Sequence, residues 1–294
     1  MLPDSQMLRV AARSAAACAE RMRLPLRTRV WQGAAGELAG AGTGVSMDFQ
    51  DHRPYFPGDD PRHINWQAYA RTGQYTMKLY REEVRPAVDI LFDASPSMFL
   101  TPEKARRSAE LLHFVTECAQ RAGAGLSIHL LRAATARIIE PSAVAALRWV
   151  DEIPAADAAP NTLPDLRPIH LRTNGLRILI SDLLFAGDPA ALLRALGQGH
   201  GSSIILGPFA PEEAAPDWEG ACDFIDVESG QQEARHIDAG VRRRYQTAYD
   251  AHFQMWKEQA RRFRCPLARI PATGSLEEAL SSGALPAGAV ETGN

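Results

Sequence analysis

The fold of this chain is decided by the stretch Ala87-Val88-Asp89-Ile90-Leu91-Phe92-Asp93-Ala94-Ser95-Pro96-Ser97-Met98. Its apolar part, Val88 to Phe92, has the length and composition of a buried strand. Asp93, Ser95 and Ser97 then follow at every second position, a spacing that puts all three side chains on one side of an extended segment. Oxygen-only ligands suit a hard cation such as Mg²⁺, and open α/β sheets bind ligands at the carboxyl ends of their strands.

Strands and helices alternate along the chain after this stretch. A second apolar strand at 176–180 ends in Ser181-Asp182, which places another acid at a strand end. The alternation predicts an α/β fold with a Rossmann-like, doubly wound and mostly parallel sheet. The other expected strands are 126–131, 137–139, 202–206, 222–227 and 267–270, and the expected helices are 101–123, 143–153, 189–196, 240–264 and 276–280.

The first 85 residues do not continue this alternation. They contain an amphipathic pattern typical of a helix at 4–23, a glycine-rich loop at 31–44 and a half-buried strand at 75–83. We therefore expect an appended N-terminal subdomain at 1–85, packed on a main domain at 86–282. The small residues of 283–294 predict a flexible tail.

The densest polar stretch lies within this N-terminal segment. Its Pro-Gly pair favours a tight turn, and its acids and arginines are so close in sequence that some must pair if they are buried. Two adjacent carboxylates could also bind metal or act in catalysis, but adjacent side chains usually point apart, so we expect a structural ion-pair network. The residues concerned are Arg53, Pro57, Gly58, Asp59, Asp60, Arg62, Trp66 and Arg71.

The composition of the 294 residues is that of a globular protein, with 46% hydrophobic and 23% charged residues. A net charge of -3 gives no electrostatic case for binding nucleic acid or an anionic membrane. No apolar stretch approaches the length of a membrane span. The four cysteines have no paired spacing, so we expect neither a zinc site nor disulfides, and a cytoplasmic location.

The oxygen-bearing residues resemble the metal-ion-dependent adhesion site of von Willebrand factor type A domains. Asp93-x-Ser95-x-Ser97 follows the first strand, Thr162 lies in a later loop, and Asp182 follows a subsequent strand. The resemblance implies that Ser95, Ser97 and Thr162 hold Mg²⁺, Mn²⁺ or Ca²⁺, with Asp93 and Asp182 acting directly or through water. One coordination position would stay open for a carboxylate of a partner protein.

A longer resemblance is carried by Tyr55-x-Pro57-Gly58-Asp59-Asp60-Pro61-Arg62-x-Ile64-Asn65-Trp66, together with Ser181-Asp182 and Asp226-x-Glu228-x-Gly230. This pattern is similar to a bacterial family known only as domain of unknown function number fifty-eight. Most of its members carry Asp where this chain has the uncharged Asn65. The family is often encoded beside MoxR-type AAA+ ATPases, which implies a non-enzymatic adaptor that works with such an ATPase.

Two other interpretations remain open. A metal-dependent phosphohydrolase could use Asp93 as its nucleophile, although such enzymes need a second carboxylate where this chain has Ser95. The sequence also shows no Lys or His near Asp182 that would complete a catalytic set. Alternatively, Asp93 and Asp182 only cap helix N-termini in a structural α/β protein that binds no ion.

Overall fold

The computed structural model divides the chain into two compact units. One unit combines Met1–Pro25 with Ala87–Asn294, and the other is Leu26–Pro86. The structure describes residues 2–26, 30–34, 47–57, 59–83, 85–155, 163–228 and 230–293.

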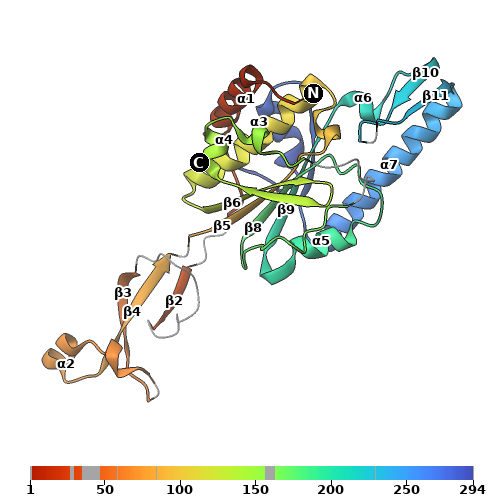
Figure 1. The fold of residues 1–294 in the computed structure, drawn as a ribbon. Coiled ribbons are helices and arrows are strands. Elements are labelled where there is room, and N and C mark those ends of the chain that lie inside the picture. Colours follow the sequence, from red (N-terminus) through yellow and green to blue (C-terminus); the bar gives the residue numbers. More distant parts are fainter. Residues whose placement is uncertain are drawn as a thin grey trace. The chain divides into compact units, whose positions relative to one another are not determined.

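The first unit is built on a six-stranded sheet with the order β12-β9-β8-β5-β6-β7 (Figure 1). All neighbouring strands are parallel except β6 and β7, which are antiparallel. The sequence prediction of a mostly parallel, Rossmann-like sheet is therefore confirmed. The strands are β5 (Ala87–Asp93), β6 (Gly125–Arg132), β7 (Thr135–Ile139), β8 (Leu176–Ile180), β9 (Ser202–Phe209) and β12 (Leu267–Pro271).

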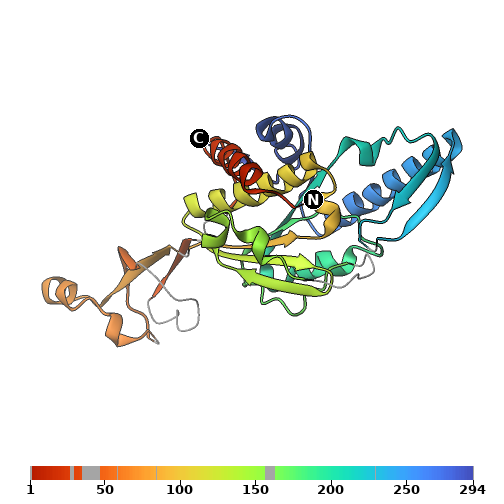
Figure 2. The same ribbon diagram turned by 45° about the horizontal axis from the view of Figure 1, so that its top comes forward.

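Helices cover both faces of this sheet (Figures 1 and 2). On one face, α5 (Ala190–Leu196) and α7 (Ala239–Arg262) bury a cluster that includes Phe253 and Trp256. The opposite face is covered by α3 (Pro102–Arg121), against which α1 (Ser5–Ala19) packs with its buried Leu8, Ala11 and Ala15. Burial on both faces explains why β5 and β8 are continuous apolar runs.

The remaining helical segments are short. The helix predicted at 143–153 is divided into two pieces, because Leu147 adopts a φ of +59° and its N–H bonds back to Val144. That geometry is typical of a helix end. The short segments are η3 (Pro96–Phe99), α4 (Pro141–Ala145), η4 (Trp149–Glu152), η5 (Gln198–His200), α6 (Pro211–Ala214), α8 (Leu276–Ala279) and η6 (Leu280–Ala284).

The strand predicted at 222–227 does not join the main sheet. It forms β10 (Gly220–Ile225), which pairs in an antiparallel hairpin with β11 (Gln232–Ile237). The side chains of β10 alternate between exposed and half-buried, so the strand has one solvent face and is not a central strand.

Both ends of the chain belong to the first unit. The contacts of α1 with α3 place it with the sheet and not with the segment predicted to end at residue 85. Near the C-terminus, Ala289 and Val290 are buried, and β13 (Glu291–Thr292) pairs with β1 (Met22–Arg23). This arrangement differs from the flexible tail predicted at 283–294.

The second unit contains a three-stranded antiparallel sheet with the order β2-β4-β3. Ile64, which lies outside the strands, forms an isolated antiparallel bridge with Met77 of one strand, and both residues are buried. The strands are β2 (Val30–Ala34), β3 (Met47–Pro54) and β4 (Thr76–Glu83), and the helices are η2 (Pro61–His63) and α2 (Trp66–Thr72).

Candidate functional site

The candidate site begins at Asp93, the last residue of the central strand β5. Its side chain is only 4% exposed. Asp93 Oδ1 accepts a hydrogen bond from the backbone N–H of Ser95 at 2.9 Å, and Oδ2 accepts one from the Ser181 hydroxyl at 2.7 Å. Because Ser181 directly follows β8, this second bond joins the ends of two neighbouring parallel strands.

The two serines after Asp93 lie side by side. The hydroxyl oxygens of Ser95 and Ser97 are 3.0 Å apart and hydrogen-bond to each other. Their segment is not extended as the sequence suggested, because Pro96 begins the short helix η3, for which Ser95 is the N-terminal cap residue. The helical turn, instead of strand alternation, therefore brings the two hydroxyls together.

Asp182, at the end of β8, is 2% exposed and already has a positive partner. Its Oδ2 accepts a hydrogen bond from the ammonium group of Lys104 at 2.8 Å, and its Oδ1 accepts one from the N–H of Leu184 at 3.2 Å. Lys104 lies in the first turn of α3, is fully buried and also bonds to Glu213 of α6. The structure thus places a lysine beside Asp182 that no pattern in the sequence indicated.

The site holds more negative than positive groups. Burial raises the pKa of Asp93 to about 7, and the nearby carboxylate of Asp182 adds to the rise. Burial also raises the pKa of Glu213, although Lys104 opposes that shift. For Lys104, burial alone would lower the pKa, but the carboxylates of Asp182 and Glu213 outweigh it and the net shift is upward.

A further carboxylate comes from the turn between β10 and β11. Glu228 Oε1 accepts a hydrogen bond from the backbone N–H of Ser97 at 3.2 Å. Burial raises the pKa of Glu228, and the bond from Ser97 opposes the rise. In the sequence Glu228 belongs to a family pattern but carries no sign that it lies at the site, because a residue in the turn between two strands does not reveal a partner that is distant along the chain.

The structure brings together four of the five predicted metal-site residues. Asp93, Ser95 and Ser97 meet Ser181-Asp182 at one edge of the sheet, whereas Thr162 lies outside the described residues. Within the described residues, no group of three or more His, Cys, Asp or Glu side chains is placed to hold a metal ion. A cation here would therefore depend on the serine hydroxyls together with the acids.

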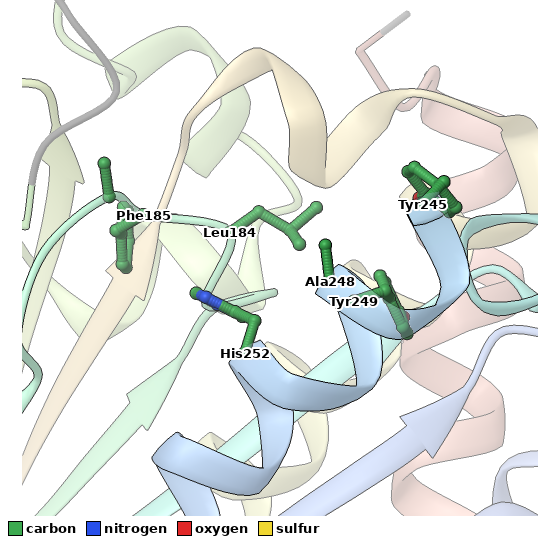
Figure 3. A pocket seen from close by; sticks show the side chains of 7 residues that line it. Leu184, Phe185, Tyr245, Ala248, Tyr249 and His252 are labelled. Carbon is green, nitrogen blue, oxygen red and sulfur yellow. The ribbon is translucent and has the colours of Figure 1, made fainter. Parts of the chain in front are cut away.

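An apolar pocket of about 320 Å³ adjoins this edge of the sheet (Figure 3). Leu184 and Phe185, which follow Asp182, form one wall, and residues of α7 form the other. His252 of α7 lies with Nε2 2.8 Å from the carbonyl oxygen of Leu183, a buried residue with a φ of +63°. A bulky residue in that conformation is strained and needs support from its surroundings, and the contact with His252 of α7 supplies part of that support.

The polar signature forms two ion pairs in the second unit. Arg53 donates two hydrogen bonds of 2.7 Å to Asp59, whose pKa falls to about 2 because of this pairing and the N–H of Phe56. Asp60 pairs with Arg62 at 2.8 Å and caps η2.

The rest of the signature surrounds α2. Asn65 caps this helix by accepting the N–H of Ala68, and Trp66 is 56% exposed, with its ring edge-on to Tyr69 and Tyr75. Pro57 and Arg71 are exposed, and Gly58 lies outside the described residues.

The fold and the site together define a mixed α/β protein with a buried, oxygen-rich cluster at the carboxyl edge of a mostly parallel sheet. The family model described as "Protein of unknown function DUF58" matches residues 51–255. The chain therefore belongs to this family, as the sequence resemblance indicated. No helix in the described part of the chain is both long and apolar enough to cross a membrane.

The chain is also similar to two solved structures. One is the conserved hypothetical protein BatB from Bacteroides thetaiotaomicron, with 15% identity, a TM-score of 0.32, and coverage of 60% of this chain and 99% of that one. The other is an aerotolerance-related membrane protein from Bacteroides fragilis carrying multiple mutations to serines, with 16% identity, a TM-score of 0.32 and the same coverages. Neither likeness is strong enough to carry over a fold or a function. A search of curated proteins found no match.

Proposed function

We propose that this chain is a non-enzymatic, metal-dependent protein-binding module. Its site would bind Mg²⁺, Mn²⁺ or Ca²⁺ and, through that ion, an acidic side chain of a partner protein. The observation that carries the proposal is the meeting of Asp93, Ser95 and Ser97 with Asp182 at the ends of two adjacent parallel strands. That edge of an open α/β sheet is where ligands bind.

The residues present fit a hard cation. Every candidate ligand is an oxygen, and Mg²⁺ binds through a few protein oxygens while keeping several waters. Ser95 and Ser97 would hold the ion, with Asp93 and Asp182 acting directly or through water. Each carboxylate oxygen that accepts a hydrogen bond keeps a second lone pair. The surplus of buried acids around Lys104 also favours a further positive charge.

The finer identity of the site is part of the proposal. The arrangement resembles the metal-ion-dependent adhesion site of von Willebrand factor type A domains, to which Thr162 would add a further hydroxyl. When bound, the ion would offer an open coordination position to a carboxylate. The partner we propose is a MoxR-type AAA+ ATPase, and a cytoplasmic location is supported by the four cysteines, all of which are free thiols.

A structural role without any ion is the second candidate, and Lys104 favours it. The ammonium group of Lys104, whose side chain is 0% exposed, already pairs with Asp182 and Glu213. Part of the negative charge at the site is therefore balanced within the chain. The phosphohydrolase alternative also gains a lysine beside Asp182. However, an ammonium group that is fully buried and shared by two acids is not available to a substrate phosphate.

Thermal unfolding with and without divalent metal tests the proposal. At a metal concentration of ten times Kd, binding stabilises the native state by about 1.4 kcal/mol, which raises Tm by about 3–5 °C. Asp93→Ala and the milder Ser97→Ala should abolish the rise. The exposed Asp250→Ala and Ser142→Ala should keep it. A wild-type chain whose Tm does not respond to Mg²⁺, Mn²⁺ or Ca²⁺ would exclude the metal-binding function.

The partner is tested separately by a pull-down with the ATPase encoded beside this chain. We expect recovery of the ATPase with Mg²⁺ and loss of it in chelator or with Ser97→Ala. Recovery that is equal in chelator would show that any contact is independent of the ion.

A further inference from the structure

Glu228 reaches the site from the β10–β11 hairpin, which is separate from the main sheet. It lies in the β10–β11 turn, 131 residues along the chain from Ser97, whose N–H it accepts at 3.2 Å. The negative charge of Asp182 also acts on this carboxylate and helps to raise its pKa. Glu228 therefore meets the same serine that the proposed function assigns to the metal ion.

The turn holds Glu228 in place through its own hydrogen bonds. Asp226 Oδ1 accepts the N–H of Glu228 at 2.8 Å, and the Asp226 carbonyl accepts the N–H of Gly230 at 2.7 Å. Gly230 adopts a φ of +72°, which other residues rarely tolerate. The pattern Asp226-x-Glu228-x-Gly230 is thus explained by a turn that presents the Glu228 side chain.

The hairpin is anchored at its base and exposed at its tip. Trp218, just before β10, packs edge-on against Phe224 and against Tyr245 of α7. At the tip, Ile225 is 63% exposed and Val227 is 40% exposed. Both apolar side chains are therefore accessible to a protein that approaches this turn.

We propose that Glu228 is a built-in carboxylate that occupies the docking position of the partner's acidic side chain until the partner displaces it. This inference rests on the proposed function and adds a form of regulation to it. A carboxylate tethered in the same chain competes at an effective concentration in the millimolar range or above. A partner's single carboxylate would then bind only when further contacts, such as those with Ile225 and Val227, help it to displace Glu228.

The test uses the full chain loaded with Mn²⁺, with acetate as the carboxylate probe. Mn²⁺ affinity is measured by calorimetry, and the access of water to bound Mn²⁺ by water-proton relaxation. We expect Glu228→Ala and Glu228→Gln to bind Mn²⁺ roughly tenfold more weakly, because a supporting charge is lost. Each bound ion should nevertheless relax water more strongly. Acetate at tens of millimolar should reverse that increase in the variants and leave the wild-type chain unchanged.

Glu233→Gln is the matched control, because Glu233 is an exposed acid of the same hairpin that pairs with Arg235 at 2.8 Å. It should behave as the wild-type chain does. Wild-type binding of Mn²⁺ combined with unchanged affinity, relaxation and acetate response in both Glu228 variants overturns this inference alone. No binding of Mn²⁺ to the wild-type chain overturns the proposed function and this inference with it.

Discussion

Lys104 is a fully buried lysine whose ammonium group is shared by Asp182 and Glu213. It stands in the first turn of α3, where the helix dipole disfavours a positive charge. A lysine in this unfavourable position was the one signal in the sequence that its ammonium group is paired with buried acids. Its ammonium supplies a positive charge to the same carboxylate that the proposed metal ion would use.

We expect Lys104→Met to destabilise the metal-free protein by about 3–5 kcal/mol, because it leaves buried Asp182 and Glu213 without their positive partner. The loss should become smaller in saturating Mg²⁺, since the ion can take over part of the charge compensation. Urea unfolding in chelator and in Mg²⁺ measures both values.

Arg121→Met is the control for this change. Arg121 makes an ion pair of 2.7 Å with Glu117 on the same helix, but it is 44% exposed. Loss of an exposed pair should cost no more than about 0.5 kcal/mol. If Lys104→Met lowers the free energy of unfolding by as little as the control does, the buried ammonium group does not stabilise the site.

At the scale of elements, helices α1, α3 and α4 line a surface pocket of about 350 Å³ beside His113. His113 lies on α3 and is 7% exposed, and its Nε2 has no hydrogen-bond partner in the described part of the chain. Arg13 and Glu117 line the same pocket. Burial lowers the pKa of His113 from 6.5 to about 4. The helix layer therefore packs around a neutral imidazole.

This packing predicts a loss of stability in mild acid. In the unfolded chain His113 takes up a proton near pH 6.5, but in the folded protein only near pH 4. The contribution of neutral His113 to the free energy of unfolding is thus fully present above pH 6.5 and is lost as the pH falls toward 4. The loss between pH 7.5 and 5 is about 2 kcal/mol. We expect the free energy of unfolding of His113→Gln to fall by about 2 kcal/mol less than that of the wild-type chain between pH 7.5 and 5. Urea unfolding at these two pH values measures the difference.

The control is His170→Gln, which changes an exposed histidine. Its unfolding free energy should follow the wild-type pH dependence. An unchanged pH dependence in His113→Gln would mean that the helices open far enough for the imidazole to be protonated in the folded state.

The elements also show what the sequence can and cannot predict. β5 and β8 were predicted within a residue or two because burial on both faces makes each an uninterrupted apolar run, and their polar ends revealed the site edge. Lys104, Glu213 and Glu228 were missed as site residues because they come from elements far apart in the sequence, and their contacts follow no periodic pattern. β3 was missed because its strand is mostly polar, and β11 because most of its side chains are exposed.

At the scale of the whole molecule, one compact unit is inserted into another. Along the sequence, the unit of residues 26–86 follows α1 and precedes β5, which both belong to the first unit. It contains a separate sheet of three strands. The N-terminal residues stay with that unit through the packing of α1 on α3 and the pairing of β1 with β13. Every described residue of the proposed metal site also lies in the first unit.

This organisation predicts that the first unit folds without the inserted one. A chain in which a flexible Gly/Ser linker replaces residues 26–86 should unfold cooperatively and keep its near-ultraviolet circular dichroism. It should also keep the Tm response to divalent metal found for the full chain. The physical reason is that the buried contacts of α1, β1 and the sheet all lie within the first unit.

A second deletion, of residues 1–86, isolates the contribution of α1. It uncovers the surface of α3 against which Leu8, Ala11, Ala15 and Cys18 are buried. Loss of that burial should cost several kcal/mol, since each large apolar side chain contributes about 1.5–3 kcal/mol. The 1–86 deletion should therefore unfold at a much lower urea concentration than the linker variant. Equal stability of the 1–86 deletion and the linker variant would mean that α1 does not stabilise the first unit. It would then belong with the N-terminal segment, as the sequence alone suggested.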